Sequence, residues 1–200
     1  MAVHGRVDEP GGGAPAAFAL AQEALRRVRV RPEVLLNEAP APQRLAPFSV
    51  ALTAEVVVDG VDLASGRLVV LHDPDGQEAW HGVTRLVAYV KAECEPEMVA
   101  DPLLPSVGWT WLGEALESRG AAAVAMSGTV TRVASESFGG LADAGRGATA
   151  ELELRASWTP VGDDLDLHVE AWVDLMCIAA GLPPVPQGVA ALHPRRRRST

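Results

Sequence analysis

Apolar and polar residues alternate along several stretches of this chain, and this period of two predicts β-strands. Between Phe48 and Val58 the apolar side chains fall on one side, while Thr53 and Glu55 fall on the other. A run apolar on both sides, RLVVLHD, is typical of an inner strand. The pattern predicts strands over 48–58, 67–73, 126–138 and 148–158.

The segment 80–94 supports two interpretations. Leu86 and Val90 alternate with Arg85 and Tyr89, which favours a strand, but apolar residues at spacings of three and four would also form a helical stripe. The turn sequence DPDG before it predicts a hairpin, and the β-branched content agrees. We therefore predict a strand, with a helix as the alternative.

Helical spacing of apolar residues predicts three helices, over 15–28, 106–119 and about 163–180. Ser106 is predicted to cap the second helix and Asp163 or Asp164 the third, and glycines follow both helices. Four prolines between positions 31 and 47 exclude a long helix there. We expect this linker to wrap over another part of the fold.

Two of the five tryptophans, Trp109 and Trp111, lie in the second predicted helix, about 200° apart around its axis. We predict that Trp109 packs inward with Leu112 and Leu116, and that Trp111 reaches a different surface. The proline-rich linker or the last helix would cover Trp111 there. The alternative is exposure in a partner-binding groove, where tryptophan is a favoured anchor.

The element order α-β-β-β-α-β-β-α predicts an α+β fold of two layers, a mainly antiparallel five-stranded sheet with helices on one face. This order is similar to the secretion-chaperone-like fold, whose members are small acidic proteins that dimerise and hold partner segments. We expect a single domain over 13–184, between a disordered N-terminus (1–12) and a disordered basic tail (185–200).

Charge and composition narrow the classes of partner. A net charge of −9 argues against nucleic-acid binding. Only the run of arginines from Arg195 to Arg198 favours it. No stretch approaches the roughly 18 apolar residues of a membrane span, and residues 1–15 do not resemble a signal peptide. Cys94 and Cys177 lie in apolar surroundings typical of free thiols. We expect a cytoplasmic protein.

Candidate chemistry is sparse. His168 and Glu170 match half of a zinc deaminase motif whose cysteine partners are missing, and the acidic residues between 93 and 101 lack the spacing of a calcium loop. His72 and His81 flank the predicted hairpin, where cross-strand packing is the ordinary role. No nucleophile elbow or phosphate-binding loop is present. We therefore assign no catalytic residue, no cofactor and no metal site.

Several long segments taken together, RPEVLLNEAPAPQRLAP, GRLVVLHDPDGQEAWHG, EPEMVADPLLPSVGWTWL and SGTVTRVASESFGGL, resemble the uncharacterised actinobacterial family DUF3000. The resemblance covers roughly 18–184. It implies a shared fold but carries over no activity, substrate or catalytic residue, because none is assigned to the family.

The leading hypothesis is a non-catalytic binding, adaptor or chaperone-like protein that forms a homodimer or binds a protein partner. Its predicted interaction surface consists of Trp111, Trp80, Arg85 and Tyr89. The alternative is an enzyme or small-molecule binder that uses a pocket between the sheet and the loop from Gly139 to Gly147.

Overall fold

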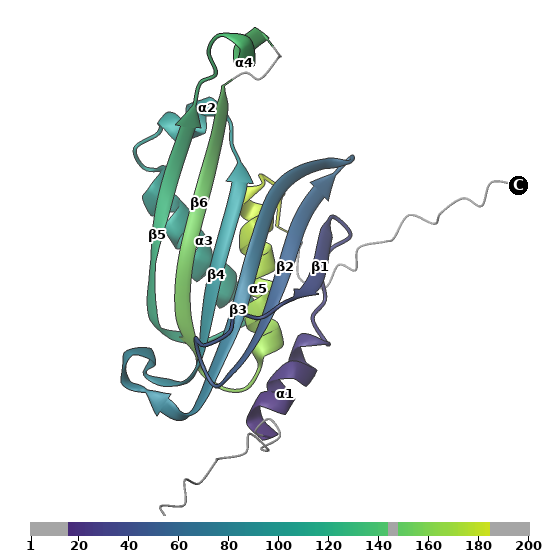
Figure 1. Cartoon of the computed structure of the whole chain (residues 1–200), viewed down its shortest axis with the longest axis vertical. Coiled ribbons are helices and arrows are strands. Elements are labelled where there is room, and N and C mark those ends of the chain that lie inside the picture. The colour runs from purple at the N-terminus through teal and green to yellow at the C-terminus, as the bar shows by residue number, and fades with distance from the viewer. Residues whose placement is uncertain (1–15, 144–147, 185–200) are drawn as a thin grey trace, which may run out of the picture.

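The alternating segments form one antiparallel sheet of six strands, with helices on one of its faces (Figure 1). The structure, a computed structural model, describes residues 16–143 and 148–184. Strand order is β1-β2-β3-β4-β6-β5. In chain order the elements are α1 (Ala16–Leu25), β1 (Val34–Ala39), β2 (Phe48–Val58), β3 (Val61–Gln77), a 3₁₀ turn (Glu78–Trp80), β4 (Gly82–Glu93), α2 (Pro96–Ala100), α3 (Leu104–Arg119), β5 (Ala123–Ser135), α4 (Gly140–Asp143), β6 (Thr149–Pro160) and α5 (Leu165–Ala179).

The segment with two interpretations is a strand, β4, which pairs with β3 on one side and β6 on the other. The DPDG sequence does not form the hairpin tip. Its residues interrupt the register of β3 between His72 and Gln77, and the chain reverses at the 3₁₀ turn, where His81 adopts a left-handed conformation (φ 57°). The turn residues thus form an irregularity within a longer strand, because pairing resumes at Gln77 and Gly82.

The sheet has six strands, one more than the five predicted. Strand β1 lies in the proline-rich linker and pairs with β2 at the sheet edge, from Val34 opposite Val56 to Ala39 opposite Ala51. Pro32 and Pro40 flank the strand instead of interrupting it. An edge strand this short has a weak sequence signal, because its stability comes from pairing with a distant segment.

The main core lies between the inner face of the sheet and α5. Trp158 and Trp172 are fully buried there. Gly66 of β3 leaves room for α5, because a Cβ atom at that position would lie 2.8 Å from the Met176 sulfur and 2.9 Å from the Trp172 ring. The helix therefore approaches the strand more closely than a larger residue would allow.

Helix α3 packs on β5 and β6 with Gly108 at a close contact between its tryptophans. A Cβ at Gly108 would touch Val130 and Leu152 across the interface, at 3.4 and 3.6 Å. At 3.6 residues per turn, Trp109 lies about 100° to one side of Gly108 and Trp111 about 60° to the other. The two tryptophans therefore straddle one contact, and both are half-buried against the main core.

Trp109 packs inward on the core that contains Leu112 and Leu116, as predicted, and Trp111 packs both on this core and on a second surface. Trp109 lies over Gly128 of β5, and Trp111 also packs on a smaller cluster that contains Val99 and Leu104. Neither the proline-rich linker nor α5 supplies that smaller cluster. The cap was also wrong: α3 begins at Leu104, and the Ser106 hydroxyl donates to the Leu103 carbonyl at 2.8 Å.

An ion-pair network links α3 to α5. The Arg119 guanidinium donates to Asp174 on the neighbouring helix and also to Glu170. These hydrogen bonds and charges raise the pKa of Arg119, chiefly through Asp174. The two helices therefore lie on the sheet as one layer, and they leave the opposite face of the sheet uncovered.

Gly128→Ala tests the close contact between α3 and the sheet. Its Cβ would lie 2.3 Å from the Arg155 carbonyl oxygen and 2.7 Å from the Trp109 ring. We expect a loss of about 1–3 kcal/mol in the free energy of unfolding, measured by urea denaturation.

Gly113→Ala is the matched control, because Gly113 lies within α3 and its Cβ would meet nothing within 4 Å. We expect it to stabilise the protein by about 0.5–1 kcal/mol. Equal effects of the two substitutions would show that Trp109 does not rest on Gly128.

Candidate functional site

The sheet face opposite the helices is covered over only part of its width. Residues after β1 fold back over β2 and β3, where Ala41, Ala46 and Trp80 pack on a small cluster of Ala51, Val69 and Leu71. The Ser49 hydroxyl donates to the Pro42 carbonyl at 3.1 Å, and Arg67 donates to the Pro40 carbonyl. The proline-rich linker thus wraps over the sheet, as expected, and leaves β4, β6 and β5 open.

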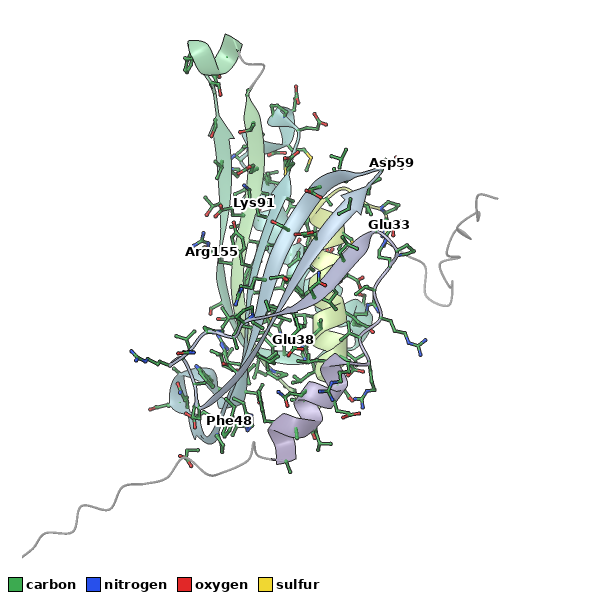
Figure 2. The ribbon with its side chains drawn as sticks, turned by 45° about the vertical axis from the view of Figure 1, so that its right-hand side comes forward. Glu33, Glu38, Phe48, Asp59, Lys91 and Arg155 are labelled. Carbon is green, nitrogen blue, oxygen red and sulfur yellow. The ribbon has the colours of Figure 1, made fainter. Side chains whose placement is uncertain are left out.

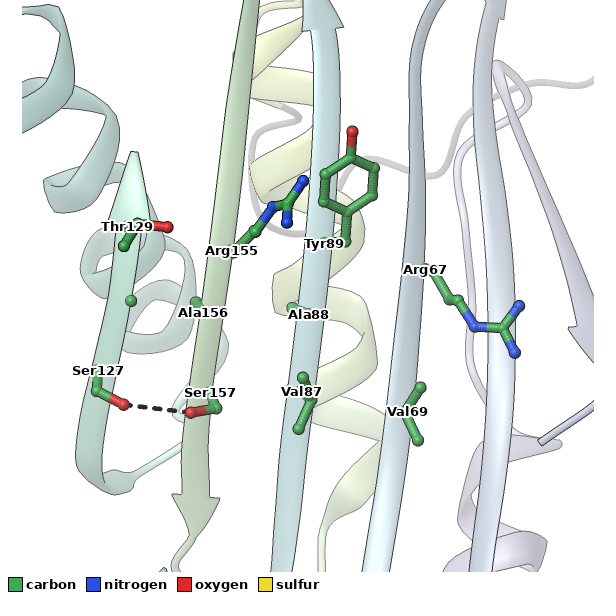
Figure 3. Close-up of a pocket in the computed structure, with 11 residues that line it drawn as sticks. Arg67, Val69, Val87, Ala88, Tyr89, Ser127, Thr129, Arg155, Ala156 and Ser157 are labelled. Atoms are coloured by element: carbon green, nitrogen blue, oxygen red, sulfur yellow. Dashed lines mark hydrogen bonds between the residues drawn. The ribbon is translucent and has the colours of Figure 1, made fainter. Parts of the chain in front are cut away.

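A groove of about 630 Å³ lies on this open part of the sheet (Figure 3). Its floor is apolar, with Val69 on β3 and Val87 on β4 side by side. Polar side chains from four strands surround the floor. The polar lining residues are Arg67, Tyr89, Ser127, Thr129, Arg155 and Ser157.

One end of the groove carries a stacked pair of charged and aromatic side chains. The Arg155 guanidinium lies 5.2 Å from the centre of the Tyr89 ring, and it donates to Glu153 at 3.0 Å. Figure 2 labels Arg155 together with Lys91, which pairs with Glu151 at 2.8 Å. Burial and the neighbouring Glu153 raise the pKa of Tyr89, so its phenol stays neutral at physiological pH.

The other end of the groove is underlain by a buried arginine, Arg85, only 7% exposed. It extends from β4 across β6 to β5. Its Nη1 donates to the Ala125 carbonyl at 2.8 Å and the Thr159 hydroxyl at 3.2 Å, and its Nη2 donates to the Ser157 hydroxyl at 2.7 Å and the Ser127 hydroxyl at 3.3 Å. The Thr159 hydroxyl in turn donates to the Trp80 carbonyl.

Arg85 has no carboxylate within salt-bridge distance among the described residues. Burial without an anionic partner lowers its pKa, yet guanidinium remains charged in proteins. Arg67 likewise bonds a carbonyl instead of an acid. Two uncompensated positive charges therefore lie at the groove, on a chain whose net charge is −9.

The chemistry of the groove is that of a binding site. Its lining offers guanidinium, phenol and hydroxyl donors but, among the described residues, no histidine or cysteine. His72 packs against the Phe18 and Phe48 rings and hydrogen-bonds to the Thr84 hydroxyl, and His168 lies in the core. The arrangement can hold an anionic group beside an apolar one.

Three of the four residues of the predicted interaction surface meet on this face. Tyr89 lines the groove, Arg85 lies beneath it, and Trp80 borders it through the Thr159 hydrogen bond. Trp111 belongs to the helical layer instead. Their role in binding stays a prediction.

Sequence reasoning did not single out Arg67, Arg155, Ser127 and Ser157, which complete the groove. The available signal was the polar side of each alternating strand: these residues and Tyr89 all occupy outward positions in paired strands. The order of the strands, which the sequence does not provide, brings them together.

The alternative pocket was predicted at the loop from Gly139 to Gly147, of which residues 144–147 lie outside the described part of the chain. The groove has no lining residue between 139 and 143. The predicted disordered segments 1–12 and 185–200, with Arg195 to Arg198, also lie outside it.

The described residues contain no group of three or more His, Cys, Asp or Glu side chains placed to hold a metal ion. In the acidic segment 93–101, the Asp101 carboxylate accepts the Leu103 amide at 2.8 Å and so fixes the turn before α3. Within the same described residues, no helix has the length and apolar character to span a membrane.

A family model described as "Protein of unknown function (DUF3000)" matches residues 14–190. The comparisons with curated proteins and with solved structures gave no match.

The buried pair of Trp158 and His168 makes stability depend on pH. Trp158 Nε1 donates to His168 Nδ1 at 3.1 Å, so Nδ1 carries no proton, and burial lowers the pKa of His168 to about 4. Because the unfolded pKa is about 6.5, the unfolded state binds more protons between these values, and acid favours unfolding there.

We expect wild type to lose about 2–3 kcal/mol of unfolding free energy through His168 between about pH 7.5 and about pH 4.5. In His168→Gln the amide oxygen still accepts from Trp158 but does not titrate. Urea denaturation of both proteins at the two pH values isolates the difference, since other groups titrate alike. An equal pH dependence in both proteins would contradict a neutral, buried His168.

Proposed function

The chain belongs to the DUF3000 family, and we propose that it is a non-catalytic binding protein that holds an acidic segment of a partner polypeptide on the open sheet face. The observation that carries this proposal is the reversal of charge at the groove. Arg67 and Arg85 lack carboxylate partners there although the whole chain is acidic. An acidic partner would gain an ion pair with Arg67 and the attraction of the buried Arg85 charge, neither of which a carboxylate of the described residues supplies.

The shape of the surface favours an extended partner over a compact one. The floor of Val69 and Val87 continues across neighbouring strands, and polar side chains stand on both sides of it. An extended segment that carries both acidic and apolar side chains would match both features. An adaptor or chaperone-like role in the cytoplasm is consistent with such a surface.

A second copy of this acidic chain is one candidate partner, and the homodimer is part of the proposal.

A competing proposal, a small-molecule site, has one observation in its favour. The volume of about 630 Å³ lies in the range of pockets for small ligands.

The proposal is tested with a fluorescein-labelled peptide of alternating Glu and Val, about ten residues long, added to the full chain. We expect saturable binding by fluorescence anisotropy that weakens as salt is raised, and no binding of the corresponding Lys and Val peptide. Val87→Glu should weaken binding at least about tenfold, because it places a negative charge on the apolar floor.

The matched control is Val107→Glu on α3. The two valines are similarly exposed, at 39% and 42%, and the two variants have equal net charge. A full chain with Arg195 to Arg198 replaced by Gln removes a second cationic segment that an acidic peptide could bind. Equal affinity of the two Glu variants, or loss of binding with the tail substitutions alone, would contradict the proposed surface.

A further inference from the structure

The hydrogen bonds of Arg85 leave a donor at the surface of the groove. A guanidinium only donates, so Ser127 and Ser157 must both accept from Arg85 Nη2. Their hydroxyl oxygens are also 3.2 Å apart and share one hydrogen bond (Figure 3). That bond uses one of the two hydroxyl hydrogens.

The second hydroxyl hydrogen has no acceptor among residues 16–143 and 148–184. Neither serine makes another hydrogen bond, and the other hydroxyl that Arg85 contacts, Thr159, already donates to Trp80. Ser127 and Ser157 both line the groove, so the free hydrogen can reach a ligand bound there. The serines thus present to the groove a hydroxyl donor held in place by a buried positive charge.

From this arrangement we infer that Ser127 and Ser157, positioned by Arg85, form a carboxylate-binding subsite within the groove. It rests on the proposed function and specifies it: the subsite receives a Glu or Asp side chain of the partner segment. Arg85 acts through the serines, because acceptors already occupy both hydrogens on each of its Nη atoms.

The charge balance selects a single negative charge. Arg85 supplies one uncompensated positive charge, and the serines supply one free donor, which match a carboxylate. A phosphate dianion has more oxygen atoms and more charge than this subsite can satisfy. A cation is excluded by the adjacent guanidinium, because desolvation strengthens the repulsion between like charges.

The subsite is tested without a peptide, by titrating sodium acetate into the isotope-labelled full chain and recording amide NMR spectra. We expect saturable shifts at Ser127 and Ser157, absent with sodium chloride at the same ionic strength. Inorganic phosphate should bind at least about threefold more weakly than acetate at a pH where it is mainly dianionic. No saturable shift at the two serines, or tighter binding of phosphate, would overturn the inference.

Three variants separate the subsite from a general charge effect. Arg85→Met and the double variant Ser127→Ala with Ser157→Ala should each weaken acetate binding at least about tenfold. The double variant retains Arg85, so the test survives if Arg85→Met fails to fold. Arg67→Met removes the same charge from the far side of the groove and should change affinity less than about threefold. Equal losses in Arg67→Met and Arg85→Met would overturn the inference.

The two proposals can fail separately. If acetate binds at the serines but the Glu and Val peptide does not bind the groove, the subsite stands and the polypeptide-binding proposal falls. If the peptide binds with equal affinity to wild type and the double serine variant, the groove stands as a docking surface and the subsite falls.

Discussion

The two faces of the sheet cannot both be buried by helices that pack on one side only. Alternation sends Leu68, Leu86 and Leu154 toward α5 and α3, and it sends the neighbouring residues to the opposite face. The linker covers only the β2 and β3 part of that face. The remaining strands must therefore present side chains that tolerate water and a partner alike, and the groove lies among them.

Arg85 gives this open face its specific character. A buried charge without a counter-charge is costly, and here four hydrogen bonds to a backbone carbonyl and three hydroxyl oxygens on β5 and β6 offset part of that cost. An apolar residue would fill the position at lower cost in desolvation. The positive charge thus remains available to attract an anionic ligand. The serine hydroxyl groups that accept from Arg85 are oriented by it, and they line the surface where such a ligand would bind.

Local pattern predicted β2 and β6 and the buried side of each, because alternation extends over most of both strands. It did not predict β1, which pairs with residues from 12 (Ala39 with Ala51) to 22 (Val34 with Val56) positions away, or the position of DPDG within β3. The inward packing of Trp109 was predicted correctly, but the preceding residue, Gly108, was not recognised as a close contact of the helix with β5 and β6. The groove was found only in part: Arg85 and Tyr89 lie on one strand, but Ser127 and Ser157 reach them through the strand order β4-β6-β5.

The central claim is that the open face, and not the helical layer, receives an acidic segment. The most direct measurement is methyl NMR of the full chain with the Glu and Val peptide carrying a nitroxide spin label at one end. We predict paramagnetic broadening of the Val69 and Val87 methyl signals, which lie on the groove floor, with the Val107 signals unchanged. Broadening at Val107 without broadening at Val87 would contradict the claim.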